Sequence, residues 1–109
     1  MKPEAGKNTL TNSQKKFLRK LGHGLSPVVY IGKEGLSETV AEAIDAALNH
    51  HELIKVKIIN TDKLSKHKAA EQIPEQCGCQ LVQLIGKTLL LFRPSTDKKR
   101  EERIRLPNK

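Results

Sequence analysis

The sequence predicts a single small α/β domain in which elements of order α-β-α-β-α-β-β form a mixed four-stranded sheet with helices mainly on one face. Three segments show apolar residues with helical spacing, and short β-branched runs lie between and after them. The length of 109 residues suits one domain. We expect residues 1–10 to form a disordered basic lead-in and residues 11–94 the domain. Residues 95–109 should be a charged, mobile tail, in which Ile104 and Leu106 could add a short strand.

The first half of the chain is expected to hold two helices and one strand. Thr11 and Gln14 have the spacing of a capping box, which predicts a helix over about residues 12–21. The β-branched run "SPVVYIG", residues 26–32, predicts a strand. The next helix should end near His50, and its apolar residues recur every four positions: Leu36, Val40, Ile44 and Leu48.

The second half is expected to hold one strand, one helix and a final pair of strands. The run "ELIKVKIIN", residues 52–60, alternates, so one face should pack on helices while the other carries lysines. Residues 62–77 have helical spacing, with a bend or an early end expected at Pro74, because an interior proline removes a backbone hydrogen bond. Two strands should follow, joined by a hairpin turn at Gly86.

The charge of the chain is strongly positive and unevenly distributed. The formal net charge of +8 favours an anionic partner, with nucleic acid first. Residues 1–33 hold seven Lys or Arg and one acid, whereas residues 34–54 hold five acids and neither Lys nor Arg. This segregation favours a binding face over a merely solvated surface. Aromatic residues make up only 3% of the chain, so contacts should be mostly to the phosphate backbone rather than by base stacking.

Three kinds of chemical site find little support. Gly86-Lys87-Thr88 lacks the earlier glycine of a P-loop and lies between predicted strands, so a hairpin turn is the better interpretation. Cys77 and Cys79 lack zinc-site spacing, and we expect reduced structural thiols. No nucleophile has an evident base and orienting partner. We therefore expect no enzyme activity, cofactor, metal or small-molecule substrate.

The sequence also lacks the signals of export or membrane insertion. No stretch approaches the apolar length of a membrane span, and the N-terminal residues have no apolar core of a secretory signal. We expect a cytoplasmic protein without a membrane partner.

The stretch "GKEG", Gly32 to Gly35, lies where a predicted strand gives way to a helix. Glycine permits positive φ and leaves room for a ligand, and a helix N-terminus presents N–H groups and a positive dipole end. With Lys33 as a mobile cation, this loop could cradle a phosphate, as the GXXG loop of KH domains does. Glu34 would oppose a phosphate, and plain turn chemistry explains a bare glycine pair equally well.

Three longer stretches, "SPVVYIGKEGLSETV", "AALNHHELIKVKI" and "IGKTLLLFRP", resemble the CRM domain, named for chloroplast RNA splicing and ribosome maturation, in its stand-alone bacterial, YhbY-like form. The resemblance covers about Thr11 to Pro94. It implies a fold similar to the C-terminal domain of translation initiation factor three. It also implies RNA binding and, for bacterial members, association with precursors of the large ribosomal subunit. By position, it implies a basic first helix that carries Lys15, Lys16, Arg19 and Lys20.

We therefore expect a non-catalytic, monomeric RNA-binding protein that contacts ribosomal RNA during assembly of the large subunit. The GXXG loop would receive phosphate, with the other cations surrounding the bound strand. The expected RNA-binding residues are Gly32, Lys33, Glu34, Gly35, Lys15, Lys16, Arg19, Lys20, Lys55, Lys57 and Lys87. The alternative is a protein-interaction adaptor in ribosome assembly that uses the acidic second helix and an apolar strand edge without direct RNA contact.

Overall fold

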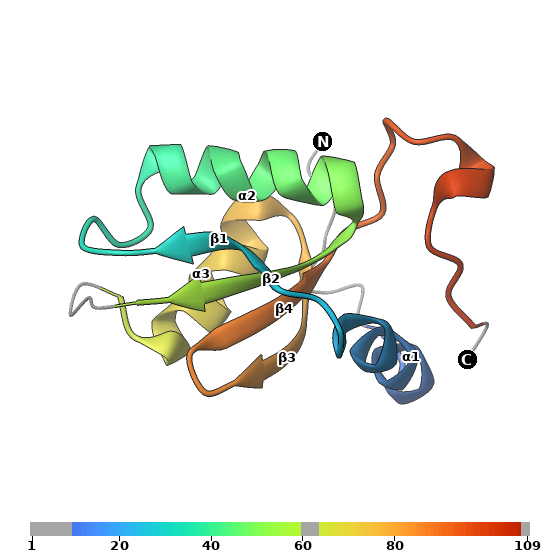
Figure 1. The fold of residues 1–109 in the computed structure, drawn as a ribbon, viewed down its shortest axis with the longest axis horizontal. Helices are drawn as coiled ribbons and strands as arrows, with labels where there is room; N and C mark the ends of the chain where they lie inside the picture. Colours follow the sequence, from blue (N-terminus) through green and yellow to red (C-terminus); the bar gives the residue numbers. More distant parts are fainter. Residues whose placement is uncertain (1–9, 60–63, 108–109) are drawn as a thin grey trace.

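Four strands form one mixed sheet in the order β1-β2-β4-β3 (Figure 1). The computed structural model describes residues 10–59 and 64–107. In chain order the elements are α1 (Asn12–Gly22), β1 (Pro27–Ile31), α2 (Glu38–His51), β2 (Leu53–Ile58), α3 (Lys66–Cys77), β3 (Gln80–Ile85), β4 (Thr88–Phe92) and the 3-10 helix η1 (Arg100–Glu102). β1 is parallel to β2, and β4 is antiparallel to β2 and β3. The predicted order and the mixed sheet are confirmed.

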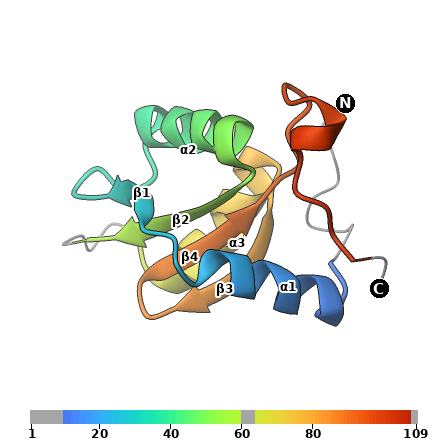
Figure 2. The same cartoon turned by 45° about the vertical axis from the view of Figure 1, so that its right-hand side comes forward.

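The helices lie on both faces of the sheet, two on one side and one on the other. α2 and α3 pack together against one face, and α1 covers part of the opposite face beside β2 and β3 (Figure 2). Each helix begins at a residue whose side chain accepts a backbone N–H: Thr11, Ser37 and Ser65. The predicted capping box at Thr11 is present.

The third helix departs from its prediction at its start and runs past Pro74 to the predicted end at Cys77. It begins at Lys66 rather than near residue 62, and the first two predicted positions lie outside the described residues. Pro74 lies in the last turn of the helix without ending it early, although its nitrogen cannot donate the backbone hydrogen bond of that position. The carbonyl of Pro74 accepts the N–H groups of Gly78 and Cys79, and Gly78, at φ 61°, forms the left-handed cap that the sequence predicted.

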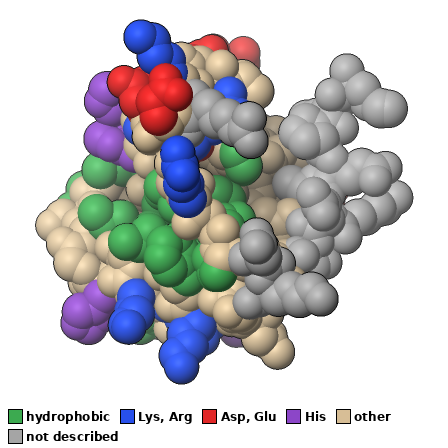
Figure 3. All heavy atoms as spheres, turned by 90° about the vertical axis from the view of Figure 1, so that its right-hand side faces the viewer, with side chains coloured by type: hydrophobic (Ala, Val, Ile, Leu, Met, Phe, Trp, Pro, Cys, Tyr) green, Lys and Arg blue, Asp and Glu red, His purple; other side chains and the backbone are tan. Residues whose placement is uncertain are grey.

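The sheet separates two apolar cores. The larger lies under α2 and α3, and the alternating residues Ile54, Val56 and Ile58 all point into it, as predicted. The smaller lies under α1 and consists of Leu18, Leu53, Val82, Leu90 and Phe92. The hydrophobic residues packed around this smaller core are only partly buried. Figure 3 shows hydrophobic side chains gathered at this end of the molecule, with Lys and Arg side chains around and among them.

The tail after β4 is docked against the domain, which differs from the predicted mobile segment. Ile104 and Leu106 pack against the smaller core without forming a strand. Glu52, only 1% exposed, holds the tail with both carboxylate oxygens: one accepts the N–H of Ser95 at 2.7 Å and the other that of Ile104 at 2.6 Å. Glu52 has a φ of 67°, which turns the chain from α2 into β2.

Candidate nucleic-acid interface

The GXXG segment forms a tight turn that uses part of its own backbone. The N–H of Gly35 donates to the carbonyl oxygen of Gly32 at 2.9 Å, and the N–H of Ser37 donates to Gly35 at 3.0 Å. Gly35 has a φ of 68°, which favours glycine, whereas a Cβ at Gly32 would meet nothing within 4 Å. The N–H groups of Lys33 and Glu34, at the exposed tip, have no intramolecular acceptor among the described residues. The turn can therefore offer a ligand its tip N–H groups and the open side of Gly32, but not the N–H of Gly35.

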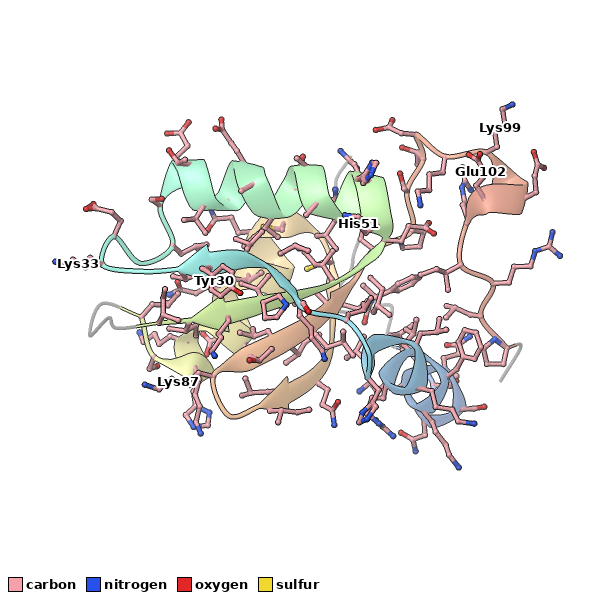
Figure 4. All side chains as sticks on the ribbon, in the orientation of Figure 1. Tyr30, Lys33, His51, Lys87, Lys99 and Glu102 are labelled. Atoms are coloured by element: carbon pink, nitrogen blue, oxygen red, sulfur yellow. The ribbon has the colours of Figure 1, made fainter. Side chains whose placement is uncertain are left out.

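The turn shares one end of the sheet with the β3–β4 hairpin. The N–H of Ile59 donates to Ile31, just before the turn, and the N–H of Ile58 donates to Lys87 in the hairpin, each at 2.8 Å. Lys33 and Lys87 consequently lie at the same end, as Figure 4 shows, and both are exposed. Gly86, at φ 57°, begins the hairpin turn that the sequence predicted.

The two lysines of β2 lie on the α1 side of the sheet, opposite the larger core, as predicted. Lys57 is exposed and pairs in register with Tyr30 of β1. Lys55 is half-buried, and its Nζ donates to the carbonyl oxygen of Leu25 at 2.9 Å. Lys55 therefore also holds the segment between α1 and β1, while Lys57 is available to a ligand.

The α1 cations form a separate group and do not surround the GXXG turn. α1 and the turn lie toward opposite ends of the sheet in both ribbon views (Figures 1 and 2). Lys16 and Lys20 are exposed, and Lys15 is half-buried. Arg19 links the two groups, because it lines a cavity of about 50 Å³ between α1 and the sheet with Lys55, Thr88 and Ile85. The cations follow the α1 side of the sheet rather than gathering around one pocket.

A row of four side chains crosses the part of this face that α1 leaves open. We call it the open row: Tyr30, Lys57, Thr88 and Ile85, which are in register across all four strands. Tyr30 is 52% exposed and Ile85 is 59% exposed. Neither residue was among the binding residues predicted from the sequence. The available signal was the alternation in "PVVYI", since Val29 and Ile31 enter the larger core and leave Tyr30 on the face of Lys57.

Charge is divided between the α1 side of the sheet and α2, while α3 beside α2 carries the exposed cations Lys66 and Lys68. The α1 side carries the cations described above. On the other side, α2 has no Lys or Arg and carries the acids Glu38, Glu42 and Asp45. Asp45 is paired with Arg93, whose guanidinium also donates to Asn49 and to the carbonyl oxygen of Cys77. The acidic stretch seen in the sequence thus becomes a surface directed away from the cationic one.

The two cysteines are structural, as expected from their spacing. Both are buried, and burial, with a smaller contribution from Cys77, raises the pKa of the Cys79 thiol to about 12. Because the thiolate is the form that attacks and that binds metals, a thiol with so high a pKa is a poor nucleophile and metal ligand. Among the described residues there is no group of three or more His, Cys, Asp or Glu side chains arranged to hold a metal ion. None of the described helices is long and apolar enough to span a bilayer.

Comparison with known proteins decides the family. The sequence model of the CRS1 / YhbY (CRM) domain matches residues 10–93, most of the chain. The chain belongs to the CRM family. The resemblance that the sequence suggested is confirmed, and the matched residues span α1 to the end of β4.

Relatives of this CRM-domain chain carry names that refer to RNA. It is 46% identical over 101 residues to a Haemophilus influenzae protein named RNA-binding protein, covering 93% of this chain and 98% of that one. It is 38% identical to a Bacillus subtilis protein named Probable RNA-binding protein YqeI, covering 85% and 97% of the two chains. The solution structure of the hypothetical protein SAV1595 from Staphylococcus aureus superposes with a TM-score of 0.71 at 37% identity, covering 91% of this chain and all of that one. The CRM fold therefore extends over nearly the whole molecule.

Proposed function

We propose that this CRM-domain protein binds RNA through the α1 side of its sheet and through the sheet end that carries the GXXG turn, without catalysing a reaction. The division of charge between the α1 side of the sheet and α2 carries the proposal, because a polyanion would meet cations on the α1 side and acids on α2. Names of close relatives agree with an RNA ligand.

In this proposal the sheet end receives the phosphate backbone. The tip of the GXXG turn supplies N–H groups and Lys33, and Lys57 and Lys87 supply charge beside it. Arg19 and the exposed α1 lysines extend the contact along the same side. Glu34 weakens the site at the tip, since it places a negative charge where phosphate would approach.

A matched pair of double variants tests the RNA site. Lys57→Gln/Lys87→Gln removes two charges from the sheet end, and Lys66→Gln/Lys68→Gln removes two exposed charges from α3 on the opposite side. Affinity for a single-stranded RNA should be measured across a salt series. The first variant should flatten the slope of log K against log[salt] by about 0.7 for each lost phosphate contact, whereas the second should keep the wild-type slope. Equal effects of the two variants would show only a net-charge effect and reject the site.

We further propose that the RNA is ribosomal RNA in precursors of the large subunit. The experiment is to sediment cell extracts at low and high salt and follow the protein through the ribosomal fractions. Co-sedimentation with large-subunit precursors at low salt, released at high salt, is expected. Absence from every such fraction would reject the assembly role without touching RNA binding itself.

An adaptor that binds an assembly protein instead remains the second candidate, because α2 presents an acidic surface free of Lys and Arg. Replacing the four α1 cations, Lys15, Lys16, Arg19 and Lys20, by Gln separates the two functions. Lower RNA affinity supports the RNA site, and unchanged RNA affinity favours the adaptor.

A further inference from the structure

The open row places an aromatic ring where a backbone-binding site alone needs none. Tyr30 is half exposed on β1, two residues before the GXXG turn, and Lys57 lies beside it on the neighbouring strand. Figure 4 shows Tyr30 on the sheet between Lys33 and the body of the domain. The row has Tyr30 at one edge of the sheet with Lys57 beside it, and Ile85 at the other edge beside Thr88. Its two exposed apolar side chains favour a binding partner, and its lysine does not suit a buried core.

The chemistry of the row fits an unpaired nucleobase. An aromatic ring stacks on any base, and a lysine beside it can contact the phosphate that joins that base to the next. Adjacent strands lie roughly 4.8 Å apart, so Lys57 is within reach of a phosphate attached to a base over the ring. We propose that one unpaired base of the bound RNA stacks on Tyr30 while Lys57 contacts the adjoining phosphate. This inference rests on the proposed RNA-binding function.

The surroundings of the row decide how the base is held. The cavity that Thr88 and Ile85 share with Arg19 has a volume of about 50 Å³. That is space for one or two water molecules, so the base lies over the row rather than in a pocket. Duplex RNA keeps its bases stacked inside the helix and presents phosphates and 2′-hydroxyls, so only a single-stranded segment can use the ring. An apolar protein partner fits less well, because it would cover Lys57, and charged residues are depleted in the core of such interfaces.

The composition of the chain allows a direct test. Tyr30 is the only tyrosine and there is no tryptophan, so the intrinsic fluorescence of the wild-type protein reports the environment of this ring alone. The protein is titrated with a single-stranded uridine oligonucleotide and, separately, with inorganic polyphosphate, a polyanion without bases. The oligonucleotide should quench the tyrosine emission. Polyphosphate should compete with the oligonucleotide for binding to the protein. By itself it should leave the tyrosine emission unchanged.

Variants of β1 give a second, independent measurement. Tyr30→Phe keeps the ring and should keep the affinity for the uridine oligonucleotide. Tyr30→Val removes the ring from a strand position that suits valine, and should weaken that affinity about five- to 150-fold. The salt slope should stay that of the wild type, since no phosphate contact is lost. Val28→Ala is the matched control: Val28 is 48% exposed on the same strand but lies at a register shift outside the open row.

The outcomes separate this inference from the function beneath it. If the oligonucleotide binds while the emission stays constant, or if Tyr30→Val binds like the wild type, stacking is overturned and backbone binding stands. If RNA and polyphosphate both fail to bind, the proposed function falls and the inference with it. If Tyr30→Val retains RNA affinity but loses a protein from a cell extract, the row belongs to a protein partner and the proposal is overturned.

Discussion

The substitution Glu52→Gln should destabilise the fold by releasing the tail. The two carboxylate oxygens of Glu52 accept the N–H groups of Ser95 and Ile104, and glutamine offers only one oxygen. One N–H would keep a weaker, neutral acceptor, at a loss of about 1 kcal/mol, and the other would face an NH₂ group, at a cost of about 1–3 kcal/mol. Together these costs would lower the free energy of unfolding by about 2–4 kcal/mol. The neutral amide does not carry the desolvation cost of a buried carboxylate, so we expect a loss in the lower part of that range.

Thermal unfolding measures this loss. For a domain of this size, about 2–4 kcal/mol corresponds to a fall in melting temperature of roughly 8–30 °C. Glu101→Gln is the matched control, because Glu101 lies in the same tail and is exposed. Trypsin should also cut the Glu52→Gln protein faster at Arg103 and Arg105. The reasoning is refuted if the two variants melt at the same temperature and resist trypsin equally.

Three further changes have expected outcomes. Glu34→Gln should raise RNA affinity up to about fivefold at low salt, since it removes one exposed negative charge at the turn, and a gain that survives high salt would contradict this. Arg93→Lys should lower the free energy of unfolding by about 2 kcal/mol in denaturant titrations, because a lysine lacks the planar fork that reaches Asp45 and Asn49; an unchanged midpoint would argue against it. The raised pKa of Cys79 means that the folded chain keeps a proton that the unfolded chain releases above pH 9. Stability should therefore fall between pH 9 and about 12, by up to about 1.4 kcal/mol per unit, and Cys79→Ala should show a shallower fall in the same titration.

Local patterns predicted most of the secondary structure. The alternation in residues 53–58 assigned the buried and the lysine-bearing faces of β2 correctly, because a half-buried strand imposes a period of two. The capping residue Thr11 and the glycine cap at Gly78 marked a helix start and a helix end, since each satisfies backbone groups within a few positions. Pro74 did not end its helix early, and the helix runs to Cys77, the end that the apolar spacing predicted.

Contacts between residues that lie far apart in the chain could not be predicted from the sequence. The docking of the tail depends on Glu52, whose acceptors meet N–H groups 43 and 52 positions away, and no local pattern marks such a pair. The placement of α1 and the GXXG turn toward opposite ends of the sheet divides the cations into two groups, which charge counts along the chain cannot show. Ile85 shares the open row with Tyr30 only because β3 pairs with β4, β4 with β2 and β2 with β1. The contribution of the GXXG turn to binding stays a prediction.

The contact between Gln14 and the carbonyl oxygen of Pro107, at 3.0 Å, has a practical consequence. It brings the start of α1 and the last described residues to one pole of the domain, and the GXXG turn lies toward the other (Figure 1). A purification handle or biotin label attached beyond either terminus would therefore join the described part of the domain at the same pole. Protein tethered in this way to a sensor chip should present its glycine turn and hairpin to the solution, whichever terminus is used.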